Sequence, residues 1–191
     1  MDKPNTLTAI ANLALTLLGE ATISSIDSTD ARAVVARRVF PQVLREVQSS
    51  YRWPELIVEW APTAAEETNS ADDLYRFELP AACLRILDIM TDRAYRVEGG
   101  YLITAEEEPT VRYLAYSETP GDWSTQLVQC VVHKLAIEIA PTLTEGLKRR
   151  DALQQEYELR ILPQARHVSS IGSEARSYRP RRHQWARAHQ R

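Results

Sequence analysis

Apolar residues recur at three- and four-residue intervals near the start of the chain, with polar residues between them. The apolar positions of this first stretch are Leu7, Ile10, Ala14, Leu17 and Leu18. This spacing puts them on one face of a helix. Asn5 is a candidate N-cap, and Gly19 is a natural stop because glycine accepts the left-handed conformation that ends many helices.

A second helix is predicted to begin near Asp30, after a polar connection. Its apolar stripe repeats every four residues, at Val35, Val39, Val43, Val47 and Tyr51. Pro41 interrupts this stripe. Proline lacks a backbone N–H and clashes with the preceding turn, so the sequence predicts a kink or a break into two helices around Phe40.

Between Trp53 and Ser117 the apolar spacing changes to alternation, and Tyr, Val, Ile and Thr become frequent, as in β-strands. The predicted strands are Leu56–Ala61, Leu74–Leu79, Leu84–Met90, Ala94–Glu98, Tyr101–Thr104 and Thr110–Tyr116. Gly99 and Gly100 separate two of them and predict a hairpin with a two-residue turn. Residues 62–73 are polar and predict an exposed loop.

Helical spacing returns after Trp123, in a broad apolar stripe that we expect to end at Pro141. Thr142 and Glu145 have the spacing of a capping box, which predicts the start of a last helix. That helix should run to about Leu162, where Pro163 bends or stops it. Gly172 and Pro180 then argue against further regular helix.

These elements predict an α+β fold that is mainly α. A helical bundle is formed by residues 1–53 and 119–172, and residues 54–118 form an inserted antiparallel β region. Residues 1–172 make a single domain, because a chain of 191 residues with 44% hydrophobic composition is long enough for one core. Residues 173–191 form an extended basic C-terminal arm.

Charge is divided unevenly between body and arm. The net charge is −3, yet residues 176–191 hold six arginines and no acid. Residues 1–175 therefore carry a net negative charge. A short segment of like charges gains little from folding alone and is typical of an arm that reaches a partner.

No targeting or membrane segment is expected. The most apolar stretch, Leu127–Leu143, is interrupted by His133, Lys134 and Glu138, so it is too polar to span a bilayer. The N-terminus lacks the pattern of an export signal, which predicts that the chain stays in the cytoplasm.

Candidate chemistry is sparse. Cys130 and His133 lie three residues apart on a predicted helix, where two side chains could share a metal, with Cys83 as a conceivable third ligand. No second pair accompanies them, and a packed helix explains them better. An activated thiol needs an exposed, electropositive setting, which an apolar stripe does not provide. Glycine-rich phosphate loops are absent, and the carboxylate pairs Glu66–Glu67 and Asp72–Asp73 lie in a polar loop. We therefore expect no enzyme activity, no metal and no cofactor.

Several short sequence segments, taken in their order along the chain, resemble the phage head-tail connector or adaptor group, which includes the tail tubular protein A family. The matching stretches are NLALTLLGE (Asn12–Glu20) with Ile26–Asp27, the helix Arg37–Trp53 ending in YRWPE, LPAACLRIL (Leu79–Leu87), YRVEGGYLIT (Tyr95–Thr104), VRYLAY (Val111–Tyr116) and LAIEIAPTLT (Leu135–Thr144). The resemblance spans nearly the whole chain, and its specificity lies in the order and spacing of these segments.

The resemblance implies a structural virion protein at the head-tail junction that is assembled in the host cytoplasm. Its subunits form a ring, commonly dodecameric, that docks on the portal protein and contacts a downstream tail or nozzle protein. DNA passes through the ring without specific binding. The C-terminal arm reaches the portal, and its matching residues here are Arg176, Tyr178, Arg179, Arg181, Arg182, Trp185 and Arg187.

The acidic body suits a conduit, because acidic side chains repel the DNA backbone and arginines hold it. The alternative function is a nucleic-acid-binding protein that grips phosphate with its arginine-rich tail. Affinity for DNA that falls steeply with salt would distinguish this alternative. We interpret the run Glu106–Glu108 as a solvated turn and not as part of a channel lining, because runs of charge usually lie in exposed loops.

Overall fold

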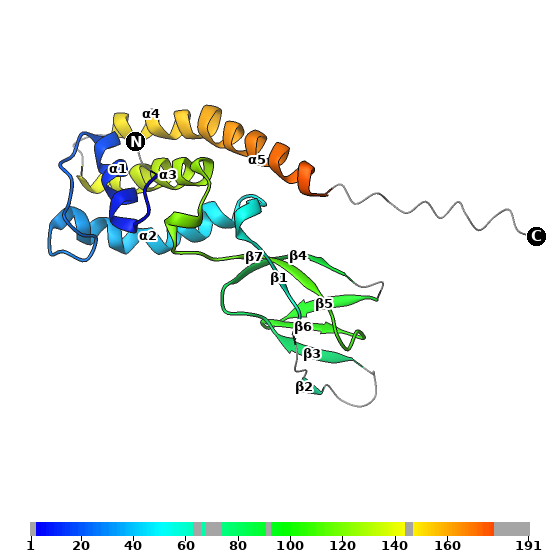
Figure 1. Cartoon of the computed structure of the whole chain (residues 1–191). Helices are drawn as coiled ribbons and strands as arrows, with labels where there is room; N and C mark the ends of the chain where they lie inside the picture. The colour runs from blue at the N-terminus through cyan, green and yellow to red at the C-terminus, as the bar shows by residue number, and fades with distance from the viewer. Residues whose placement is uncertain (1–2, 63–65, 68–73, 91–92, 144–146, 178–191) are drawn as a thin grey trace, which may run out of the picture.

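Helices and strands segregate into two parts of the molecule in the computed structural model (Figure 1). The structure describes residues 3–62, 66–67, 74–90, 93–143 and 147–177. Helices α1 (Leu7–Leu18) and α2 (Ala31–Ser49) precede the strands, and α3 (Thr125–Leu143), α4 (Leu147–Glu156) and α5 (Leu162–Ser177) follow them. The protein is therefore a mixed α+β fold in which the strands are inserted between helices.

Helix α3 lies at the centre of the helical part, where α1, α2, α4 and α5 all pack against it. The core that they share is apolar and almost fully buried. Its members include Ile10, Leu15, Phe40, Leu44, Leu127, Val131, Leu135 and Ile139. Burial of one such side chain stabilises the fold by about 1.5–3 kcal/mol, so this core dominates the stability of the helical part.

The strands form two small antiparallel sheets. The first has the order β1 (Ile57–Trp60), β7 (Val111–Ala115), β4 (Cys83–Ile89). The second has the order β2 (Glu66–Glu67), β3 (Tyr75–Glu78), β6 (Tyr101–Thr104), β5 (Tyr95–Glu98). A second, smaller core lies in the β part and is made by Phe77, Ile89, Leu102 and Val111 with Trp60 packed against it.

All six predicted strands are confirmed to within two residues at their ends. Gly99 and Gly100 have φ angles of 57° and 85°, so the hairpin between β5 and β6 uses the two positive angles that glycine permits. The exposed loop predicted over residues 62–73 is wrong in part, because Glu66–Glu67 pair with β3 as strand β2. A strand of two residues is too short to show the alternation of apolar and polar residues from which strands are predicted.

The end of α1 and the start of α2 follow the sequence, whereas the start of α1 differs by one residue. Gly19 ends α1 with a φ of 79°, and the Asp30 side chain caps α2 by accepting a hydrogen bond from the Arg32 N–H at 2.8 Å. That hydrogen bond and the Arg32 guanidinium lower the pKa of Asp30 to about 2. The cap of α1 is Thr6 rather than Asn5, since the Thr6 hydroxyl accepts from the Ala9 N–H.

Proline did not end the helices as we expected. α2 is one helix through Pro41, so the break at Phe40 is wrong. α3 likewise passes Pro141 and ends at Leu143, which places Thr142 inside α3 and not at the start of α4; Glu145 lies outside the described residues. An internal proline costs about 3 kcal/mol, and burial of Phe40, Val43 and Leu44 in α2 outweighs that cost.

The expected end of the last helix at Leu162 is also wrong. A π-helical turn, Tyr157–Ile161, joins α4 to α5, and the Leu162 N–H bonds the Tyr157 carbonyl five residues back. This wider turn lies where the Pro163 ring would otherwise clash with the carbonyl of Leu159. α5 then continues through Gly172 to Ser177, beyond the point where we expected regular helix to stop.

Two chain segments join the helical part to the β part, and side chains tie them to each other. The Gln48 side chain is fully buried; its amide donates to the Ser117 carbonyl at 2.7 Å and accepts from the Ser117 N–H at 3.0 Å. Glu55 accepts a hydrogen bond from the Ser124 N–H at 2.9 Å. Both indoles at the joint, Trp53 and Trp123, are fully buried and donate hydrogen bonds there. The joint is therefore a packed, hydrogen-bonded unit.

Replacement of Gln48 by alanine should destabilise the chain by about 1–3 kcal/mol, because it removes both hydrogen bonds between the buried amide and the half-buried Ser117 backbone. Urea unfolding followed by circular dichroism measures this. Gln42→Ala is the matched control, since Gln42 is exposed on the same helix and its loss should change stability by less than about 0.5 kcal/mol. Equal stability of the two variants would contradict the role of Gln48.

Candidate interaction surfaces

The last helix is fixed to the body as far as Ser169 and then runs on. The Tyr51 hydroxyl donates to the Arg166 carbonyl at 3.0 Å, and the Arg166 guanidinium donates to the Ser50 carbonyl at 3.3 Å. Ser169 is buried, whereas Val168 and Ile171 are exposed. Figure 1 shows the end of α5 pointing away from the other helices. The last described turns of α5 therefore lie beyond the hydrogen bonds that Arg166 makes with the body.

The structure places only one of the predicted arm residues. Arg176 lies in the last turn of α5. The others, Tyr178, Arg179, Arg181, Arg182, Trp185 and Arg187, lie outside the described residues. Their role in binding a portal remains a prediction.

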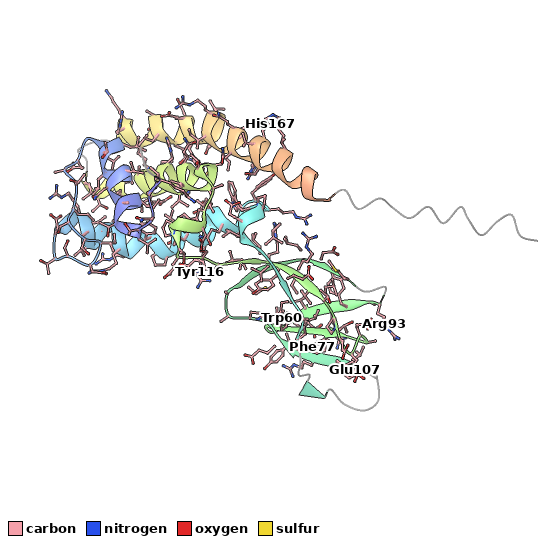
Figure 2. All side chains as sticks on the ribbon, viewed as in Figure 1. Trp60, Phe77, Arg93, Glu107, Tyr116 and His167 are labelled. Carbon is pink, nitrogen blue, oxygen red and sulfur yellow. The ribbon has the colours of Figure 1, made fainter. Side chains whose placement is uncertain are left out.

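The acidic excess of the body lies mainly in the β part. Residues 57–115 hold twelve acidic and five basic side chains, whereas residues 1–56 and 116–175 together hold fourteen and twelve. Glu106, Glu107 and Glu108 belong to the connection between β6 and β7, where Glu107 and Glu108 are exposed. Figure 2 shows Glu107 at the same end of the β part as Arg93, and the Arg93 guanidinium lies 3.9 Å from the Glu106 carboxylate. An ion pair this long and this exposed to solvent contributes little to stability.

A small pocket lies between the start of α1 and the middle of α2, and sequence reasoning did not find it. Its volume is about 180 Å³, and its apolar lining includes Leu7, Phe40 and Leu44, with Asp27 and Glu118 as its acidic members. Sites for small molecules usually measure about 300–1,000 Å³, so this pocket is of a size for one side chain. Its lining comes from four separated segments, and only the tertiary fold brings them together.

The cysteine and histidine considered for metal binding or nucleophilic catalysis do not form a site. Cys130 is fully buried in α3, and burial raises the pKa of its thiol to about 12. The His133 Nδ1 lies 2.9 Å from the Gln129 carbonyl of the same helix. Cys83 is on β4, in the other part of the molecule. Within the described ranges, no three His, Cys, Asp or Glu side chains are grouped to hold a metal ion.

No protein-family model matches the sequence, and a search of curated proteins found no match. Among the helices that the structure describes, none is both long enough and apolar enough to cross a membrane.

Thiol reactivity tests the structural role that we assign to Cys130. At pH 8 the folded chain should react with a disulfide reagent only at Cys83, and slowly, because burial raises the pKa of both thiols and Cys130 is shielded from solvent. Both cysteines should react in urea. Cys83→Ser should abolish the reaction of the folded chain; rapid labelling that survives this substitution would identify Cys130 as an activated nucleophile.

Proposed function

We propose that this chain is one subunit of a phage head-to-tail adaptor ring that docks on the portal and continues its DNA channel towards the tail. The proposal rests on the order of the short sequence segments that resemble the adaptor group. The inserted strands and the helices grouped around α3 support it, since the adaptor fold is a helical bundle with a β insertion. The downstream tail protein would contact the ring on the side away from the portal.

The observation that carries the proposal is the course of α5. The Arg166 backbone and side chain are hydrogen-bonded to the body and Ser169 is buried, and the helix continues to Ser177. The end of α5 points away from the other helices, and residues 178–191, which hold five arginines and Trp185, follow it in the sequence. We propose that this segment reaches another protein.

The composition of that segment suits a protein partner. Arginine pairs bidentately with carboxylates, and a tryptophan side chain anchors a contact by filling an apolar pocket. One such anchor contributes about 2 kcal/mol or more, and a ring repeats it in every subunit. The combined contact is therefore much stronger than one arm alone.

The charge distribution suits a channel. The β part has seven more acidic than basic residues, and acidic side chains repel DNA phosphates. A lining of this sign lets DNA slide, whereas arginines would bind it. In a ring of these subunits, we propose that the β part faces the passage.

Removal of residues 178–191 should abolish binding to the portal protein of the same virus, because this truncation removes Trp185 and five arginines. Electron microscopy of the mixture shows whether rings form on the portal, and circular dichroism checks that residues 1–177 still fold. Full-length chain that leaves the portal bare would contradict the proposal.

Single substitutions sharpen this test. Trp185→Ala should weaken portal binding about tenfold or more. Arg179→Glu with Arg181→Glu should also weaken it, whereas Lys148→Glu with Arg150→Glu, the same charge change on exposed residues of α4, should not. Calorimetric titration measures the affinities. Equal loss in both double variants would show that net charge, and not the C-terminal segment, governs the contact.

Short duplex DNA distinguishes the nucleic-acid-binding alternative. An adaptor should bind duplex DNA only weakly at physiological salt. Tight binding that is lost in the truncated chain, with an affinity that falls steeply as salt rises, would show instead that the arginines grip phosphate.

A further inference from the structure

Four strands lie at the edges of the two sheets, and β5 is the one best suited to pair with another chain. β1 and β4 are the edges of the first sheet, and β2 and β5 are the edges of the second. β2 has only two residues, and the pairing of β4 with β7 shifts register twice, which bends that edge away from a flat partner. β1 carries one charge, the acid Glu59. β5 has four residues in regular register with β6, and all of them are exposed.

The outer backbone groups of β5 belong to Tyr95 and Val97. The two-residue turn that follows β5 makes Glu98 and Tyr101 a hydrogen-bonded pair of the hairpin. Hydrogen bonding alternates along an antiparallel pair, so the backbone groups of Arg96 and Glu98 point towards β6. Those of Tyr95 and Val97 point outwards, where no described strand pairs with them. They can therefore bond a further strand.

The side chains of β5 are separated into an apolar face and a charged face. Tyr95 and Val97 pair with fully buried residues of β6 and share their face of the sheet, yet they are 51% and 47% exposed. Arg96 and Glu98 lie on the other face, with the Arg96 Nε 3.5 Å from a Glu98 carboxylate oxygen. Both of these side chains are more than half exposed, so each is open to a second partner.

A two-fold axis at Val97 makes β5 complementary to itself. In the antiparallel pair that results, Val97 of one copy lies opposite Val97 of the other, and their outward backbone groups form two N–H···O hydrogen bonds. Arg96 of each copy then lies opposite Glu98 of the other, at positions without hydrogen bonds, where side chains come closest. Each guanidinium is placed between two carboxylates, its own chain's and the other copy's.

The apolar face closes in the same register. Tyr95 lies opposite Gly99 of the other copy, which has no side chain, and diagonally across from its Val97, within reach of an aromatic ring. The two tyrosines and two valines then cover one another and withdraw their exposed apolar surface from water. Backbone, charge and apolar surface thus all favour one alignment.

We propose that free copies of this chain pair through β5, antiparallel about Val97, and join their two second sheets into one continuous sheet. A contact of this kind uses the same surface on both copies and closes after two of them. The inference therefore goes beyond the proposed ring and concerns the chain before it meets the portal. The pair also covers a sheet edge that would otherwise accept unrelated strands.

Charge reversal tests the pairing. Sedimentation velocity should show a monomer–dimer equilibrium with a dissociation constant of about 100 µM, because a contact of one short strand from each copy is small. Arg96→Glu places four carboxylates together at the contact, and Glu98→Arg places four guanidinium groups there. Each substitution should weaken pairing about tenfold.

Exchange of the two charges distinguishes this contact from a general effect of charge. The double variant Arg96→Glu with Glu98→Arg should pair as wild type does, since opposite charges still face each other. An equimolar mixture of the two single variants should also pair, because each contact then joins an acidic strand to a basic one. Arg38→Glu, on an exposed residue of α2, is the matched control and should leave pairing unchanged.

Val97→Pro tests the backbone contact. Proline removes an N–H that points outwards and not one that bonds β6, so the sheet should persist while the dimer is lost. Circular dichroism verifies the fold of every variant.

The proposal is overturned if wild type is monomeric at about 1 mM or grows beyond two copies, or if a folded Arg96→Glu, Glu98→Arg or Val97→Pro variant pairs as wild type does. It is also overturned if the charge exchange fails to restore pairing, or if Arg38→Glu weakens pairing equally. Portal binding is measured separately, so a failure here leaves the proposed function standing, and a bare portal leaves the pairing standing.

Discussion

The pairing of the Gln48 amide with both backbone groups of Ser117 fixes how the helices and the strands are joined. It ties the end of α2, through the fully buried Gln48 side chain, to the half-buried Ser117 in the chain that leaves β7. An amide in such a site is replaceable only at the cost of two unpaired backbone groups. Trp53 and Trp123 fill the space around it, so the joint has little freedom to bend.

Strand β7 extends this constraint into the β part, because it contributes to both cores. Leu114 packs into the helical core and Val111 into the core of the β part, three residues apart on opposite faces of the strand. Successive side chains of a strand alternate between its faces, so one central strand can serve two cores. The helical part and the β part therefore share strand β7, an arrangement that would suit the ring subunit proposed above.

Much of the fold was predictable because its signals are local. The six strands, the Gly99–Gly100 hairpin, the stop at Gly19 and the cap at Asp30 depend on short-range spacing or on one residue's conformational preference. The prolines misled prediction for the same reason. Pro41 lowers the local helix preference by about 3 kcal/mol, but the side chains that α2 buries against α3 restore it, and those partners lie far away in sequence.

The sequence by itself determined six of the strands, the positions of most helices, the acidic body and the basic C-terminal segment, since each is a property of neighbouring residues. Only the tertiary structure decided which strands pair, which sides of the sheets stay open, and that Gln48 meets Ser117 across 69 positions of chain. It also decided that the Cys130 side chain is fully buried and that its thiol pKa is raised. The physical reason is that burial and long-range pairing depend on the packing of segments distant in sequence, and no local pattern records which distant segment supplies the partner.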